Sequence, residues 1–258
     1  MRTILSDLGL ESPLVGTTVT AHITSSGPDG FRCTVYDVAT LEPREAVLPR
    51  ADAFDLPEGA AAPELAVGDT VIALVVGVSG TAQQGTERLM LSATAPELVE
   101  RILSGFVDDI VTGKVVIKAV ARVAGTKTKV AVVPTTKGVD ARGACIGRGA
   151  SRLKGAESLL NRGFGRERLE IIEYSGDPAT FLTNAMNPVR VTEVLIRGDN
   201  AIVAVEEHQL SGGIGEGGLN AQLAGRLTGH YVRVVKAGTD LREVLRQLAT
   251  GTGAPETG

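Results

Sequence analysis

A short glycine-rich pattern occurs twice in this chain of 258 residues and constrains its fold more than any other feature. Residues 146–150 read I-G-R-G-A, and residues 214–218 read I-G-E-G-G. A strand-like segment precedes each copy, at residues 128–133 and 201–206, and an amphipathic helix, a further strand and a last helix follow each one. This repeated frame predicts two tandem copies of one small α/β module.

Each glycine pattern predicts a tight turn between two helices. Glycine adopts backbone conformations that other residues avoid and lets another molecule come close, and the N–H groups that open the second helix attract anions. A glycine loop of this kind, packed on a short sheet, is typical of the KH domain, which holds about four nucleotides of single-stranded nucleic acid. Side-chain cations flank the first turn, so we predict RNA contacts at Gly147, Arg148, Gly149, Ala150, Ser151, Arg152 and Lys154.

Two further groups are candidate RNA contacts, each with an alternative. Lys127 and Lys129 lie on one face of the strand before the first turn, where they could reach the same RNA backbone or form a solvated strand face. The second turn adds these candidates: Gly215, Glu216, Gly217, Gly218 and Asn220. Because the Glu216 carboxylate would repel a phosphate, the second turn could equally be a structural turn without RNA contact.

The charge of the chain is distributed unevenly. The formal net charge is −4, yet residues 110–168 hold thirteen Lys or Arg against three Asp or Glu. Residues 1–109 carry six basic and sixteen acidic residues, and residues 189–250 carry seven of each. A polyanion is therefore expected to be drawn to the first of the two modules, with an affinity that falls as salt rises.

The region before the two modules reads as short strands separated by turn-rich segments. Five such segments between residues 15 and 95 predict a small closed barrel, for which the OB-fold is the candidate. In residues 31–36, Phe31, Cys33 and Val35 alternate as a core-like set, which places Tyr36 on the opposite face. The expected organisation is listed from the N-terminus: tail 1–11, OB-fold barrel 12–95, connecting helix 96–109, first KH domain 110–188, second KH domain 189–250 and disordered tail 251–258.

Several other classes of protein do not fit the sequence. No apolar run is long enough for a membrane span, and residues 1–12 lack the apolar core of a signal peptide, so a cytoplasmic protein is expected. The two cysteines, Cys33 and Cys145, fall in different modules and are expected to be buried thiols. No metal or other cofactor is predicted, because the three histidines show no partners at a metal-ligand spacing: His22, His208 and His230.

An enzyme is not expected either. There is no Walker loop, and no pair of nucleophile and base can be named. Gly213, Gly215 and Gly218 fit the spacing G-x-G-x-x-G of a dinucleotide site, but residues 208–212 separate this segment from the preceding strand. That motif requires a strand that leads directly into the turn, so the dinucleotide reading is not favoured.

Several longer stretches resemble the RNA-binding core of the NusA family of bacterial transcription factors. The most specific is LEIIEYSGDPATFLTNAMNP, at residues 169–188, and others include EAVLPR, LMLSATAPELVERI, VVIKAVAR, GACIG and QLSGGIGEGGLNAQLAGRLTG. The resemblance implies an OB-fold module followed by two KH domains of the prokaryotic type. It also implies binding to nascent single-stranded RNA and a part in transcriptional pausing, termination or antitermination, with RNA polymerase or other transcription factors as further candidate partners.

The chain departs from the family pattern at three places. In the family a sizeable polymerase-docking domain precedes the barrel, whereas about a dozen residues precede it here, so the resemblance covers the RNA-binding core only. The first turn reads GRGASR where the family has G-x-R-G-S-R, which puts Ala150 at its fourth position. Glu216 occupies a usually basic position, and Leu219 replaces a polar residue. An alternative function is a protein-interaction adaptor that uses the acidic barrel, with largely structural KH domains.

Overall fold

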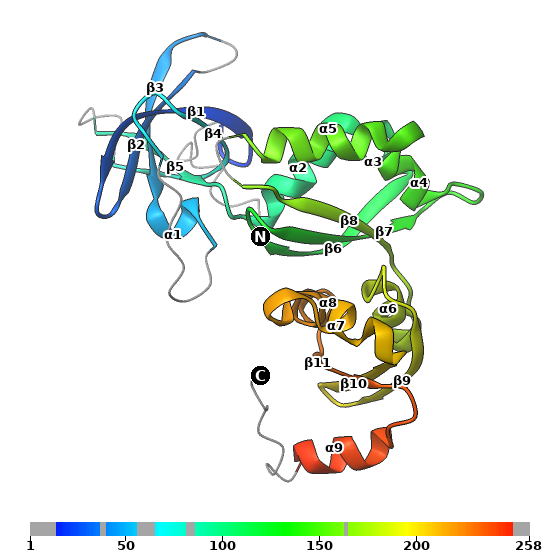
Figure 1. Cartoon of the computed structure of the whole chain (residues 1–258). Helices are drawn as coiled ribbons and strands as arrows, with labels where there is room; N and C mark the ends of the chain where they lie inside the picture. Colours follow the sequence, from blue (N-terminus) through cyan, green and yellow to red (C-terminus); the bar gives the residue numbers. More distant parts are fainter. Residues whose placement is uncertain (1–13, 37–39, 56–64, 81–85, 163–164, 250–258) are drawn as a thin grey trace. The chain divides into compact units, whose positions relative to one another are not determined.

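The protein is described from a computed structural model, which covers residues 14–36, 40–55, 65–80, 86–162 and 165–249 (Figure 1). The tails expected at residues 1–11 and 251–258 lie outside these ranges. By its contacts the described chain divides into two compact units. The first unit falls within residues 1–114, 122–128 and 143–169, and the second within residues 115–121, 129–142 and 170–258.

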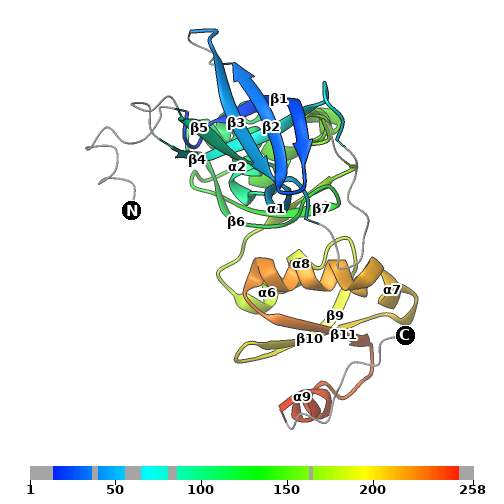
Figure 2. The same ribbon diagram turned by 90° about the vertical axis from the view of Figure 1, so that its left-hand side faces the viewer.

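The first described strands close into a barrel (Figures 1 and 2). The strand order is β1-β2-β3-β5-β4, with these bounds: β1 Thr18–Gly27, β2 Gly30–Tyr36, β3 Pro43–Pro49, β4 Thr70–Ser79 and β5 Arg88–Ser92. Neighbouring strands are antiparallel except β3 and β5, which run parallel with Ala46 opposite Leu89. A short helix, α1 (Arg50–Ala53), follows β3. The predicted five-strand barrel is confirmed, and it is consistent with an OB-like fold.

The alternation of side chains along β2 separates the core of the barrel from its surface. Phe31, Cys33 and Val35 are buried, whereas Tyr36 is 53% exposed. Burial raises the pKa of the Cys33 thiol to about 11. Cys145 is also buried, and neither thiol takes part in a disulfide. The predictions for both cysteines and for Tyr36 are therefore confirmed.

Two helices follow the barrel: α2 (Pro96–Phe106) and α3 (Asp108–Val111). Helix α2 begins with proline at its first position, where the missing N–H costs nothing. It buries the side chains of Leu98, Val99, Ile102 and Leu103. Helix α2 packs against α5, so its buried face belongs to the same core as the helix that follows the first glycine turn.

The two predicted α/β modules have the same order of elements. The first contains β6 Val115–Val123, β7 Lys127–Pro134, α4 Ala141–Ile146, α5 Ser151–Leu160 and β8 Arg168–Glu173. The second contains β9 Val191–Arg197, β10 Asn200–Val205, α7 Leu210–Ile214, α8 Leu219–Thr228 and β11 Tyr231–Lys236, after the helix α6 Pro178–Ala185. The sheet orders β6-β7-β8 and β11-β10-β9 match element by element, so the internal repeat is confirmed.

Helices cover both faces of the second sheet (Figure 2). Helices α6, α7 and α8 lie on one face, and α9 (Leu241–Ala249) lies on the other. Leu241 and Leu245 of α9 pack on Ile202 and Ala204 of β10. Strand β10 is buried on both faces, which explains why its sequence is almost continuously apolar.

Among the described helices, none has both the length and the apolar character needed to cross a membrane. Within the same described ranges, no group of three or more His, Cys, Asp or Glu residues is placed to hold a metal ion.

Candidate RNA interface

The first glycine turn joins α4 to α5 through three residues with positive φ. Gly147 has φ 73° and ψ 169°, Gly149 has φ 60° and ψ 24°, and Ala150 has φ 61° and ψ 27°. The Gly147 N–H donates to the Gly143 carbonyl at 2.9 Å, and the Ala150 N–H donates to the Gly147 carbonyl at 3.0 Å. These two bonds close the turn, and Ser151 then opens α5.

The outer side of this turn is open to a second molecule. A Cβ atom at Gly149 would meet no atom within 4 Å. At Gly147 a Cβ atom would lie 2.9 Å from Cγ of Arg152, so the turn packs closely against the first turn of α5. The free space beside the turn therefore lies at Gly149.

Cations flank the glycine turn, and the first helical turn of α5 contains no acidic residue. Arg148, Arg152 and Lys154 are exposed. The Arg152 Nη1 donates to the Ala144 carbonyl at 2.8 Å, which holds its guanidinium over the end of α4. Ala150 occupies the N-cap position of α5 and has no side chain that can accept a hydrogen bond. The positive end of the α5 dipole therefore adds to the side-chain charges.

The second glycine turn has the same backbone path between α7 and α8. Gly215 has φ 81° and ψ 165°, Gly217 has φ 57° and ψ 22°, and Gly218 has φ 80° and ψ 5°. The Gly215 N–H donates to the Ser211 carbonyl at 2.8 Å, and the Gly218 N–H donates to the Gly215 carbonyl at 3.0 Å. The charge differs, because Glu216 is exposed at the position of Arg148.

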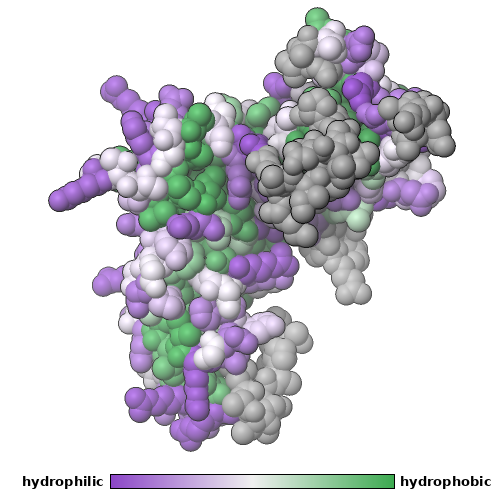
Figure 3. All heavy atoms as spheres, turned by 180° about the vertical axis from the view of Figure 1, so that it is seen from behind, coloured by the Kyte–Doolittle hydropathy of each residue, from purple (hydrophilic) through white to green (hydrophobic). Residues whose placement is uncertain are grey.

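An apolar residue precedes each turn. Ile146 is half-buried, and Ile214 is 39% exposed. Figure 3 shows the molecule from behind, where hydrophobic residues reach the surface in patches between hydrophilic side chains. Apolar surface beside a glycine turn offers a place for the faces of nucleotide bases, which stack on apolar and aromatic groups.

The structure does not support Lys129 and Asn220 as RNA contacts, because both are buried. Lys129 has no exposed surface, and its ammonium contacts the Glu170 carboxylate at 2.5 Å and donates to the Asn187 carbonyl at 3.1 Å. Asn220 is 2% exposed, and its Nδ2 donates to the Gly213 carbonyl at 3.2 Å. The interpretation of Lys129 as part of a ligand-facing strand surface is therefore wrong. Lys127, in contrast, is half-buried and stays a candidate.

These two buried side chains hold the segment between α6 and β9. Asn220 Nδ2 also lies 3.5 Å from the Met186 carbonyl, next in the chain to the Asn187 carbonyl that Lys129 binds. One donor comes from β7 and the other from α8. Their role is to fix the connection that follows α6, and the partners that reveal it are too distant in sequence for a local pattern to indicate.

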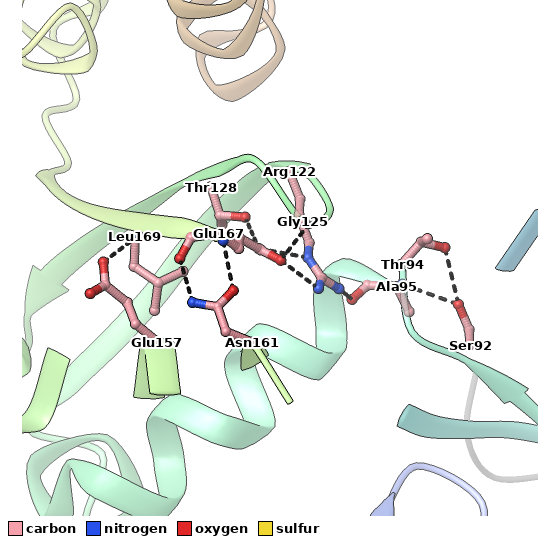
Figure 4. Close-up of polar contacts among 10 residues, drawn as sticks. All are labelled: Ser92, Thr94, Ala95, Arg122, Gly125, Thr128, Glu157, Asn161, Glu167 and Leu169. Atoms are coloured by element: carbon pink, nitrogen blue, oxygen red, sulfur yellow. Dashed lines mark hydrogen bonds and ion pairs between the residues drawn. The ribbon is translucent and has the colours of Figure 1, made fainter. Parts of the chain in front are cut away.

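A buried ion pair lies at the centre of a hydrogen-bond network in the first module (Figure 4). Arg122 binds Glu167 in a bidentate arrangement, with both N–O distances 2.9 Å, and its Nη1 donates to the Ala95 carbonyl at 2.8 Å. Glu167 also accepts hydrogen bonds from the Thr128 hydroxyl at 2.5 Å and the Gly125 N–H at 3.0 Å. The network links the N-cap of α2, the β6–β7 turn and the start of β8.

The environment of Glu167 determines its protonation. Burial on its own would raise the pKa of this carboxyl, but the hydrogen bonds and charge of Arg122, with the Thr128 hydroxyl and the Gly125 N–H, together lower it below its ordinary value. Asn161 holds the Glu167 backbone from both sides: its Oδ1 accepts from the Glu167 N–H at 2.6 Å and its Nδ2 donates to the Glu167 carbonyl at 3.2 Å. Glu167 is therefore a fixed, ionised anchor.

Comparisons with known proteins agree with this architecture. The family description "NusA-like first KH domain" matches residues 93–174, and "NusA-like second KH domain" matches residues 178–241. These ranges place α2 with the first KH fold and α6 with the second. Our own bounds for the domains, with a separate helix at 96–109, stay a prediction. Fold and turns together define a protein in which two tandem KH domains follow an OB-like barrel along the chain.

Curated relatives carry the name "Transcription termination/antitermination protein NusA". The protein of Mycobacterium tuberculosis is 41% identical over 170 residues, which cover 65% of this chain and 47% of the relative. That of Thermus thermophilus is 38% identical, with 62% of this chain and 41% of the relative covered, and that of Bacillus subtilis is 35% identical, with 61% and 42% covered. The chain belongs to the NusA-like family. The matched region spans less than half of the length of these relatives.

Proposed function

We propose that this chain is an RNA-binding factor that acts in transcription termination or antitermination and holds single-stranded RNA at its first glycine turn. The observation that carries the proposal is the turn itself, where positive-φ residues, an uncapped helix N-terminus and three exposed cations meet. The names of the relatives support a role in transcription termination or antitermination. Their names favour this function over an adaptor that uses the acidic barrel.

In the proposed mechanism the sugar-phosphate backbone passes over Gly149. N–H groups at the start of α5 donate to one phosphate, and Arg148 neutralises charge on the same or the next one. Arg152 is already bonded to the end of α4, so it acts mainly as a fixed positive charge. Backbone contacts position the RNA, whereas contacts to bases beside the turn select the sequence. The proposal includes no catalytic step.

The test places negative charge on the open side of the turn. We expect the double substitution Arg148→Asp with Gly149→Asp to weaken binding of a labelled single-stranded RNA at least about tenfold, since it removes a cation and repels phosphate. Aspartate tolerates the left-handed backbone better than most residues, so the fold should be retained. Fluorescence anisotropy at several salt concentrations measures the affinity.

A matched control is Arg242→Asp, which reverses an exposed charge on α9, a helix of the other compact unit. This control should bind RNA nearly as the parent does. Unchanged affinity in the double variant would contradict the proposed clamp. RNA polymerase or another transcription factor is the further partner that we propose, and retention of polymerase on the immobilised chain after nuclease treatment would support it.

A further inference from the structure

The two glycine turns of this chain form an internal comparison in which the backbone is constant and the charge varies. Corresponding residues differ by at most 19° in φ and 22° in ψ. Both of these largest differences fall at the pair Ala150 and Gly218, with φ 61° and ψ 27° against φ 80° and ψ 5°.

 At the other two pairs every difference is 8° or less. A Cβ atom at Gly217 or Gly218 would meet no atom within 4 Å, so the second turn is as open as the first. The backbone of the second turn therefore has the shape of a phosphate clamp.

The side chains around the second turn do not supply the matching charge. The three cations of the first turn, Arg148, Arg152 and Lys154, correspond to Glu216, Asn220 and Gln222. Asn220 is buried and holds the neighbouring backbone, so it cannot reach outward. Glu216 is therefore the charged side chain within this turn, and it is exposed.

The position of Glu216 also changes the field at the end of α8. A carboxylate next to a helix N-terminus offsets the partial positive charge of the helix dipole. The first helical turn of α5 contains no acidic residue, and Arg148 adds positive charge beside it. The second turn thus carries its own counter-charge, whereas the first leaves its positive charge for a ligand.

We propose that Glu216 keeps RNA phosphate out of the second glycine turn, so that the tandem KH pair clamps RNA backbone at the first turn only. This inference rests on the proposed RNA-binding function. It makes Glu216 a specificity-determining residue: its charge, and not the shape of the turn, sets how many phosphates the pair can hold.

The test reverses this single charge. Glu216→Arg should raise the affinity for a single-stranded RNA of about twelve nucleotides roughly tenfold and steepen the salt dependence by about 0.7 in log–log slope for each phosphate gained. Glu216→Gln should give a smaller gain. An RNA of about four nucleotides fills one KH clamp, so its affinity should change little. The control Glu193→Arg makes the same charge change at an exposed position of β9.

A second experiment tests whether RNA already contacts the second turn in the parent protein. Gly217→Asp should leave RNA affinity unchanged in the parent and should remove the gain in the Glu216→Arg variant. The inference is overturned if Gly217→Asp weakens binding by the parent, or if Glu216→Arg gains no more than Glu193→Arg. A parent that binds no RNA would instead contradict the proposed function, and the Arg148 and Gly149 substitutions test that function separately.

Discussion

Ala150 adopts a backbone conformation that favours glycine, and it does so at the centre of the candidate interface. Its φ of 61° matches the left-handed conformation of Gly218 in the second turn. An L-residue in this region costs about 1 kcal/mol or more, because Cβ crowds the backbone. The strain is compatible with a site where the turn must keep one shape for its ligand.

We expect Ala150→Gly to stabilise the protein by up to about 1 kcal/mol, because glycine relieves the strain, although it also raises the entropy of the unfolded chain. The control is Ala221→Gly, the same chemical change inside helix α8, which should destabilise by about 0.5–1 kcal/mol. Urea unfolding measures both. A destabilised Ala150→Gly variant would show that the turn is not strained at this residue.

For single residues, the sequence predicted the backbone turns but not the partners of side chains. Glycine pattern and spacing sufficed to predict the two turns, since positive φ is a local property. Lys129 lies on the same face of the strand pattern as Lys127, yet it is buried. Glu170 and the Asn187 carbonyl bind its ammonium and so compensate the loss of water. Those partners come from other elements, so periodicity along the strand could not reveal them.

At the scale of elements, the Arg122–Glu167 pair determines how the first module is assembled. It joins the N-cap of α2, the β6–β7 turn and the residue before β8 through charge-assisted hydrogen bonds. A buried pair of this kind is not in itself strong evidence for stability, but the loss of one partner leaves an uncompensated buried charge. The sequence alone showed two opposite charges among many and did not indicate that they meet.

We expect the network to make stability depend on acid pH. A carboxyl whose pKa is lowered by folding contributes stability above its unfolded value, near 4.5, and this contribution is lost as pH falls through the lowered folded value. Glu167→Gln should therefore reduce the pH dependence of unfolding below about pH 4.5. At neutral pH it should cost about 3–5 kcal/mol, because the Arg122 charge stays buried.

The measurement is urea unfolding over about pH 3 to pH 7, a range that brackets the carboxyl titration. Glu173→Gln is the control, since Glu173 is exposed at the opposite end of β8. A Glu167→Gln variant as stable as this control, with an unaltered pH profile, would contradict the role given to the network.

At the scale of the whole molecule, the arrangement of charge follows the arrangement of modules. The basic excess of residues 110–168 was visible in the sequence, and it coincides with the first KH fold and its cationic turn. Two of its thirteen cations, Arg122 and Lys129, are buried and form ion pairs with Glu167 and Glu170. The charge available to RNA is therefore smaller than the sequence count.

Order and type of the modules could be predicted because each carries local signals: alternating strands for the barrel and a repeated glycine turn for the KH folds. The assignment of α2 and α6 to KH folds depends on packing instead. Helix α2 packs against α5, and α6 packs against α8, and such contacts between separate elements leave no local pattern. The order and type of the modules could thus be predicted from the sequence, whereas the packing between elements could not.

We propose that RNA backbone lies against the first turn and not against the second. Backbone amide NMR during titration with a short single-stranded RNA tests it most directly, because it reports on each turn separately. We expect the amide signals of Arg148, Gly149 and Ser151 to shift on binding, while those of Glu216 and Gly217 stay in place. Shifts confined to other parts of the chain, with the first turn unaffected, would contradict it.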